Sequence, residues 1–270
     1  MSKINSYREV LDLSCAVRNL RKGFITNFYP DSFRVDLWCK YGSLFYYLYP
    51  ETVFFEQVER GFRHLFYIST SEQALKEALI DFLAGHETGS LVVDVLGNDS
   101  DLPVKRLFEE NGFQEYSSLI RMTRINSLVG EEKVIPDVVF QAGIGDVQEI
   151  LKLYDTYFDA YIEQIPLREE LERWIASDHV LVYRADGHIV GFLIYDLTGV
   201  TLYLRYWFVH PEYRDQKIGA ILFKEFMRRG ENTRRQLFWV ISSNENAIKR
   251  YVHYGFAIEK MFDYVLINTL

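Results

Sequence analysis

One succession of elements occurs twice along this chain, and this repetition limits its possible folds more than any other feature. In each half, three strand-like runs precede a helix, a strand, a short helix and a last strand. The runs lie at 43–50, 52–59 and 62–69 in the first half, and between 179 and 209 in the second. The short helices end alike, in "LFEENGF" (Leu107 to Phe113) and "RYVHYGF" (Arg250 to Phe256). We predict an internal duplication of an α/β domain; the alternative is two α/β domains that share a common glycine helix stop.

Composition excludes several classes of protein. The 270 residues include 20 Phe and 19 Tyr, enough aromatic surface to fill a sizeable core. The net charge of -8 repels nucleic acid and anionic lipid, so neither is expected as a partner. The two cysteines have no metal-site or disulfide-framework spacing. The N-terminus has no signal-type apolar core and no apolar run approaches about 20 residues, which favours a cytoplasmic protein.

The junction "WFVHPEYRDQKIGAILFKEF" (Trp207 to Phe226) joins a strand to a helix in the second half. The strand stops at Pro211, and a charged loop with one glycine leads into apolar residues at helical spacing. The first turn of a helix leaves N–H donors unpaired and carries partial positive charge, so such a junction can hold a phosphate. The alternative is an ordinary solvated turn. In the first half the strand "FRHLFYIS" runs directly into "TSEQALKEAL" with no proline, arginine or glycine at the junction, so no anion site is expected there.

Two segments together resemble the GNAT superfamily of N-acetyltransferases. Val209-His210-Pro211 followed by Arg214 to Gly219 resembles the pyrophosphate loop of that family, R/Q-x-x-G-x-G/A, except that Lys217 replaces the first glycine. "NENAIKRYVHYGF" resembles the family segment N-x-x-A-x-x-x-Y-x-x-x-G-F, with matches at Asn244, Ala247, Tyr251, Gly255 and Phe256. Without the resemblance, Tyr251 reads as a core aromatic and Asn244 as a helix N-cap.

The resemblance implies acetyl-CoA as co-substrate and no metal. The pyrophosphate would lie on the backbone N–H groups of Gln216 to Ala220, and the pantetheine arm would add to the edge of the strand that ends at Val209. The cofactor-binding residues would be Phe208, Val209, Arg214, Asp215, Gln216, Lys217, Ile218, Gly219, Ala220, Asn244 and Tyr251.

The implied catalytic residues are Tyr251, Asn244 and Glu163. Tyr251, with an ordinary pKa of about 10, would protonate the departing thiolate. The strand before the loop has no carboxylate to act as the base, so we assign that role to Glu163, with Asp159 as an alternative; both could equally be solvated loop carboxylates. Arg205 would suit an anionic group of the acceptor, and we interpret His210 as a bystander.

The predicted fold class is therefore α/β, a mixed, mostly antiparallel sheet flanked by helices in each of two tandem GNAT-like domains. Residues 1–128 would form a degenerate domain without a coenzyme loop, 129–136 a linker, and 137–270 the acetyltransferase domain. The implied reaction is acetyl transfer to a primary amine of a small molecule or peptide by a monomer or homodimer. The alternatives are a non-catalytic acyl-CoA-binding module and an aminoacyl transferase that uses a tRNA-borne donor.

Overall fold

A computed structural model describes residues 1–29, 31–59, 61–85, 89–125 and 138–269. The chain forms two compact units, Met1–Leu119 with Lys260–Leu270, and Ile120–Glu259. The predicted linker at 129–136 lies outside the described residues. Within the described ranges, none of the helices combines the length and apolar character needed to span a bilayer.

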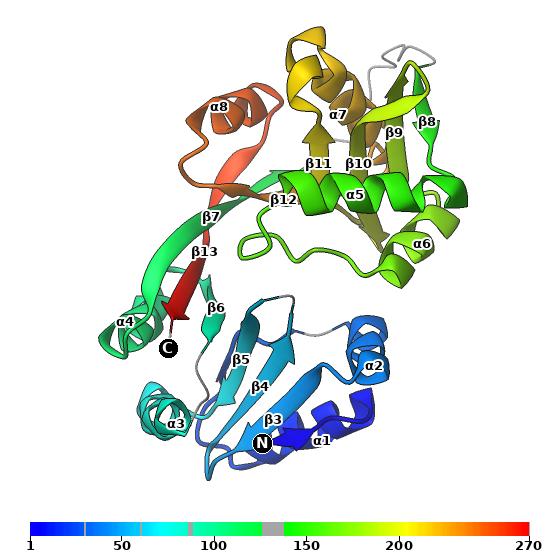
Figure 1. The fold of residues 1–270 in the computed structure, drawn as a ribbon. Helices are drawn as coiled ribbons and strands as arrows, with labels where there is room; N and C mark the ends of the chain where they lie inside the picture. The colour runs from blue at the N-terminus through cyan, green and yellow to red at the C-terminus, as the bar shows by residue number, and fades with distance from the viewer. Residues whose placement is uncertain (30, 60, 86–88, 126–137, 270) are drawn as a thin grey trace. The chain divides into compact units, whose positions relative to one another are not determined.

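The first unit repeats, element by element, the order found in the second. Its elements are β1 (Ser2–Lys3), α1 (Tyr7–Asn19), β2 (Ile25–Thr26), α2 (Ser32–Tyr41), β3 (Leu44–Leu48), β4 (Thr52–Val58), β5 (Arg63–Ser69), α3 (Glu72–Ala84), β6 (Ser90–Gly97), α4 (Leu102–Glu110) and the start of β7 (Gln114–Ile125). The second half runs β8 (Val139–Gln141), α5 (Val147–Tyr157), α6 (Arg168–Ala176), β9 (Val180–Ala185), β10 (His188–Thr198), β11 (Thr201–Val209), α7 (Ile218–Arg229), β12 (Arg235–Ile241), α8 (Glu245–His253) and β13 (Ala257–Thr269). Apart from the two-residue β2, the two successions agree (Figure 1).

Local chemistry explains a hairpin turn of the second unit and the helix stops of both halves. Asp186 and Gly187 both have positive φ, 50° and 83°, and they join the antiparallel strands β9 and β10. Gly112 and Gly255 both follow a short helix with positive φ, 92° and 84°. The matched glycine stops are part of the repeated order.

Each unit has a mixed sheet. The strand order is β1-β3-β4-β5-β6-β13 in the first and β7-β12-β11-β10-β9-β8 in the second. β5 and β6 are parallel, as are β11 and β12, whereas β3–β4, β4–β5, β6–β13, β8–β9, β9–β10 and β10–β11 are antiparallel. The predicted mixed, mostly antiparallel sheet flanked by helices is therefore confirmed.

The last strand of each half lies in the other half's sheet. Residues 262–269 of β13 pair with β6 of the first unit, and the Asn268 side chain donates to Asn111 O at 3.3 Å. From Ile120, β7 belongs to the second unit, where Thr123 Oγ1 donates to Gln236 O at 3.3 Å and Arg121 is ion-paired with Glu259. The compact units thus divide after Leu119 and after Glu259, whereas the boundaries drawn from sequence follow chain order and do not include this exchange.

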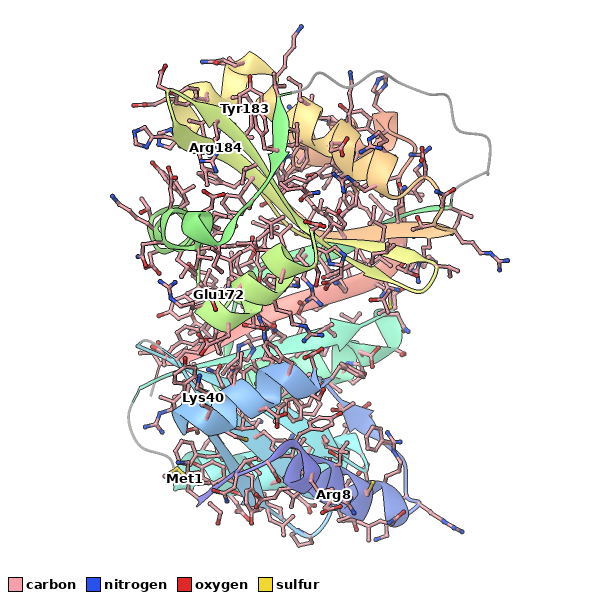
Figure 2. The ribbon with its side chains drawn as sticks, turned by 90° about the vertical axis from the view of Figure 1, so that its right-hand side faces the viewer. Met1, Arg8, Lys40, Glu172, Tyr183 and Arg184 are labelled. Carbon is pink, nitrogen blue, oxygen red and sulfur yellow. The ribbon has the colours of Figure 1, made fainter. Side chains whose placement is uncertain are left out.

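Helices cover both faces of the second sheet (Figure 1). On one face, Tyr154 of α5 and Leu171 of α6 pack with Phe192 and Phe208. On the other, α7 lies so close to β10 that a Cβ at Gly191 would approach Ile218 Cγ2 to 2.9 Å. At the outer end of the sheet, Arg184 of β9, labelled in Figure 2, donates to Asp146 Oδ1 at 2.6 Å. These contacts leave the β11–α7 junction between the two helical layers.

Candidate active site

Strands β11 and β12 run side by side for only three residues. The parallel pairing covers Thr201–Tyr203 of β11, and β12 departs after Leu237. On its other edge, β11 stays paired with β10 as far as Val209. Among the described strands, none pairs with the β12-side edge of β11 beyond Tyr203. The two strands therefore diverge, and the divergence leaves main-chain groups of β11 that an extended ligand can pair with.

A β-bulge interrupts β11 inside this free stretch. Ile194 lies opposite Tyr206 and Tyr195 opposite Leu204, so Arg205 is the extra residue. The Arg205 guanidinium is ion-paired with Asp196 and lies 4.9 Å from the Tyr203 ring centroid. The interpretation of Arg205 as a binder of an anionic acceptor group is therefore not supported, because Asp196 already neutralises its charge.

The loop after β11 forms an uncapped helix start. Residues Pro211–Gln216 form a 3₁₀ helix, Lys217 reverses the chain, and α7 begins at Ile218 without a side-chain cap. The intrahelical bond of Ile221 N goes to Lys217 O at 3.1 Å, so the N–H groups of residues 218–220 precede the regular ladder. Arg214, Asp215, Gln216 and Lys217 are exposed. Uncapped N–H donors at an open helix start are the features an anion site requires.

Lys217 occupies the conformation that glycine favours. Its φ of 60° and ψ of 11° lie in the left-handed region, which glycine enters without the steric cost that a Cβ adds. For a lysine this conformation costs roughly 1–2 kcal/mol. Lysine at this position thus puts strain in the loop.

Replacing Lys217 with glycine is expected to raise the free energy of unfolding by about 0.5–1 kcal/mol. Glycine relieves the backbone strain, and its greater conformational entropy in the unfolded chain offsets part of that gain. Urea unfolding followed by tryptophan fluorescence measures it. Lys224→Gly, at an exposed position inside α7, is the matched control and is expected to lose about 1 kcal/mol. Equal destabilisation by both changes would contradict the strained conformation of Lys217.

Gly219 brings α7 against β11. A Cβ at this position would lie 3.1 Å from Trp207 Cζ2 and 3.4 Å from Val209 Cγ2. Arg214 Nε donates to Val209 O at 3.4 Å, which ties the loop to the strand end. Ile218 and Phe208 are buried, so only their main-chain groups are open to a ligand.

Tyr251 of α8 faces the same junction. Its ring centroid is 5.8 Å from that of Trp207 and 4.5 Å from that of Phe238. Burial raises the pKa of Tyr251 above its usual value, so the hydroxyl stays protonated at neutral pH. No hydrogen bond of this hydroxyl occurs among the described residues. The geometry therefore provides a protonated donor beside Trp207.

Asn244 is the N-cap of α8. Its Oδ1 accepts from Ala247 N at 3.2 Å, and the residue is exposed. This is the structural role that the sequence offered as the alternative to coenzyme contact. The cap uses the amide oxygen and leaves Nδ2 as the group that a ligand could contact.

The corresponding position in the first unit is filled by the chain itself. Strands β5 and β6 are paired only at Arg63–His64 and Leu91–Val92, so they too diverge. Because β4 covers the opposite edge of β5, β2 lies on the β6 side, pairing Ile25 with Ser69 and Thr26 with Ile68. Nothing in the sequence pattern indicated this insertion.

Asn27 completes the filling of the gap between β5 and β6. Its Nδ2 donates to Leu65 O at 3.2 Å and to Asp94 O at 2.9 Å, and its Oδ1 accepts from Tyr67 N at 2.7 Å. The helix that follows, α3, is capped by Ser71, whose Oγ accepts from Ala74 N at 3.2 Å. The first unit therefore lacks both the open strand edge and the uncapped helix start of the second.

Glu163 lies in the loop between α5 and α6. Burial raises the pKa of Glu163 to about 7, and the nearby Asp159 carboxylate adds to this rise. Asp159 orders the loop: its Oδ1 accepts from Tyr161 N at 2.9 Å and its backbone oxygen from Glu163 N at 2.8 Å. A carboxyl with a pKa near neutrality has the acidity that a general base needs.

The raised pKa makes a stability prediction. The folded state holds a proton on Glu163 that the unfolded chain releases near pH 4.5. The contribution of Glu163 to the free energy of unfolding is therefore complete below about pH 4.5 and is lost as the pH rises through about 7. Glu163→Gln removes the charge, so its stability relative to wild type is expected to increase from pH 5 to pH 8. Urea unfolding at both pH values measures it. A relative stability independent of pH would contradict the shift.

His210 follows the last residue of β11. Its Nε2 is hydrogen-bonded to the Tyr157 hydroxyl at 2.8 Å, and its backbone N donates to Val190 O at 2.8 Å. Its Nδ1 is buried without a partner among the described residues. These contacts hold the strand end against α5. Elsewhere, no group of three or more His, Cys, Asp or Glu in the described ranges is arranged to hold a metal ion.

Comparison with known proteins agrees with this geometry. Residues 147–256 match the acetyltransferase (GNAT) family. No curated protein matches the chain. A GCN5-related N-acetyltransferase from Sphaerobacter thermophilus has a similar fold, with a TM-score of 0.59 and 14% identity over 88% of this chain and 85% of that one.

Two further structures match nearly the whole chain. A tandem GNAT protein from the clavulanic acid biosynthesis pathway has a TM-score of 0.59 and 10% identity over 98% of this chain and 97% of that one. A GNAT-family acetyltransferase from Colwellia psychrerythraea has a TM-score of 0.56 and 15% identity over 100% and 99%. At such identities, the likeness concerns the fold alone.

The family match covers residues 147–256, the part of the chain that contains the open strand edge and the uncapped helix start. In fold, nearly the whole chain is similar to a tandem GNAT protein, with two α/β units that share one order of elements.

Proposed function

We propose that this protein is an acetyl-CoA-dependent N-acetyltransferase that acetylates a primary amine of a small molecule or peptide at its second unit. The observation that carries the proposal is the free edge of β11 beside the uncapped start of α7. The first unit, whose equivalent gap contains β2 and Asn27, would bind no coenzyme. One acetyl-CoA per chain is the expected stoichiometry.

The diphosphate would be held by main-chain N–H groups from Gln216 to Ala220, with Arg214 and Lys217 supplying positive charge. The pantetheine arm would pair with the β11 edge at Phe208 and Val209. A backbone N–H near Val209 would polarise the thioester carbonyl. All these donors belong to rigid elements or to a loop tied to β11 by Arg214, which favours preorganised binding.

In the reaction, Glu163 would take a proton from the acceptor ammonium, directly or through water, and the neutral amine would attack the thioester carbonyl. Tyr251 would donate its proton to the departing thiolate. The nitrogen would lose its second proton to solvent as the amide forms, and the Tyr251 oxygen would regain a proton from solvent. Asn244 Nδ2 is assigned a coenzyme contact, since its oxygen already caps α8.

The alternatives have weaker support. An aminoacyl transferase that takes its donor from tRNA needs a basic surface, and the net charge is -8. A non-catalytic acyl-CoA-binding module would need no base, whereas Glu163 has a pKa raised to about 7.

Two experiments test the proposal. Calorimetry measures the binding of acetyl-CoA, and an assay of free thiol release measures acetyl transfer to each amine in a panel of primary amines. We expect one binding site per chain and thiol release with at least one amine. Failure to bind acetyl-CoA at millimolar concentration would refute the proposed function. Binding without thiol release would favour the acyl-CoA-binding module, and retardation of bulk tRNA in a gel at low salt would favour the tRNA-dependent alternative.

Tyr251→Phe is expected to lower turnover of the identified amine about 100-fold, because the thiolate then leaves without a proton donor. Acetyl-CoA affinity is expected to stay within about twofold of the wild-type value. Tyr254→Phe is the matched control, since Tyr254 packs on Phe223 of α7 with ring centroids 5.0 Å apart and is expected to keep full turnover. Unchanged turnover of Tyr251→Phe across the pH range would remove Tyr251 from the role of acid.

A further inference from the structure

Tyr154 is a fully buried tyrosine whose hydroxyl has no hydrogen-bond partner among the described residues. A buried hydroxyl without a partner is unfavourable, so its retention calls for an explanation. The ring is held from three sides, by Phe158 at 4.5 Å, Phe192 at 5.2 Å and Tyr206 at 5.0 Å between centroids. The hydroxyl therefore has a defined position on the face of the sheet covered by α5.

The loop that carries Glu163 folds over this position. Tyr206, in edge contact with the Tyr154 ring, donates its own hydroxyl proton to the backbone oxygen of Gln164, the residue after Glu163. Phe158, at the start of the loop, packs on the Tyr154 ring. Glu163 N donates to Asp159 O at 2.8 Å, which closes the turn. The backbone on both sides of Glu163 is thus anchored to groups around Tyr154.

Three groups act electrostatically on the Tyr154 hydroxyl: Tyr206, Glu163 and Glu170. The Tyr206 proton is directed at Gln164 O, and Glu170 Oε2 accepts from Leu167 N at 2.9 Å in the first turn of α6. Glu163 has no side-chain hydrogen bond among the described residues. The charge of the Asp159 carboxylate raises the pKa of Glu163. Among the described residues, the Tyr154 hydroxyl and the Glu163 carboxylate therefore each lack a side-chain hydrogen bond.

We propose that the Tyr154 hydroxyl donates a hydrogen bond to the ionised Glu163 carboxylate through one bridging water, and so positions the base. The inference rests on the proposed function, in which Glu163 accepts the amine proton. Tyr154 is a positioning residue in this scheme: it touches neither acetyl-CoA nor the acceptor. Its hydrogen bond favours the charged form of Glu163, against the burial and the Asp159 charge that oppose ionisation.

The test follows the ionisation of Glu163 directly. The protein is labelled with ¹³C at the glutamate side-chain carboxyl carbons, the Glu163 resonance is assigned by its loss in Glu163→Gln, and its shift is followed from pH 4 to 9. In Tyr154→Phe the Glu163 midpoint is expected to rise by about 0.5–1 pH unit, because the charged form loses a hydrogen bond. Resistance to urea is expected to fall above the Glu163 midpoint, where the variant loses the hydrogen bond to the charged carboxylate.

Tyr195→Phe is the matched control, because the buried Tyr195 hydroxyl donates to Asp178 O at 3.1 Å. It is expected to lower stability and leave the Glu163 midpoint in place. An unmoved midpoint in Tyr154→Phe, or the same rise in both variants, overturns the proposal. Absence of acetyl-CoA binding by the wild type would refute the proposed function separately, since the carboxyl titration requires neither coenzyme nor acceptor.

Discussion

Glutamate in place of Gly219 is expected to weaken acetyl-CoA binding about 100-fold. The new carboxylate would lie at the start of α7, where the uncapped N–H groups would receive the diphosphate. Two like charges about 5 Å apart at an effective dielectric constant near 20 repel by about 3 kcal/mol, which corresponds to a factor of about 100 or more in affinity. Isothermal titration calorimetry with acetyl-CoA measures the loss.

Two matched variants separate charge from shape. Gly219→Ala introduces only the Cβ, 3.1 Å from Trp207 Cζ2, and is expected to weaken binding less than about tenfold. Gly145→Glu adds the same charge at an exposed glycine with no neighbouring atom within 4 Å of the new Cβ. It is expected to bind as wild type. Equal affinities for Gly219→Glu and wild type would show that the diphosphate does not lie on this helix start.

Removing the Asn27 side chain is expected to lower the free energy of unfolding of the protein by about 3–5 kcal/mol. Asn27→Ala leaves three backbone groups, Leu65 O, Asp94 O and Tyr67 N, without their present partners in a buried gap. Each buried group left unsatisfied costs about 1–3 kcal/mol, and partial access of water reduces the sum. Urea unfolding, with circular dichroism as a check of the native fold, measures the loss.

Asn5→Ala is the control for this change. Asn5 is exposed and its Nδ2 donates to Lys3 O at 3.3 Å, so its loss is expected to change stability by less than about 0.5 kcal/mol. An effect of Asn27→Ala as small as that of Asn5→Ala would mean that the gap between β5 and β6 does not depend on this amide. It would also weaken the physical reason for a single coenzyme site.

The junction at Lys217 shows which structural features could be predicted from the sequence and which could not. The strand stop at Pro211, the helical spacing after Ile218 and the glycine at 219 each depend on neighbours a few residues away, and each is present as predicted. Whether lysine would change the loop could not be answered from residue preference. In the structure Lys217 takes a φ of 60°, in the left-handed region that glycine favours.

Glu163 and Asn27 show where sequence reasoning stops. A loop carboxylate has the same sequence pattern whether it is solvated or buried, and the raised pKa of Glu163 comes from the chain that folds around it. Asn27 lies in no recognisable motif, and its three partners are 38 to 67 residues away along the chain. No local signal in the sequence could have indicated either role.

The sequence alone determined the order of the elements, the repetition of that order, the hairpin at Asp186–Gly187 and the strand–loop–helix junction of the second half. Only the tertiary structure decided that β7 and β13 lie in each other's sheets, that one strand gap is filled and the other open, and that Glu163 is half-buried. The physical reason is range: turns, caps and periodicity arise among adjacent residues, whereas strand partners and desolvation depend on groups far apart in the chain.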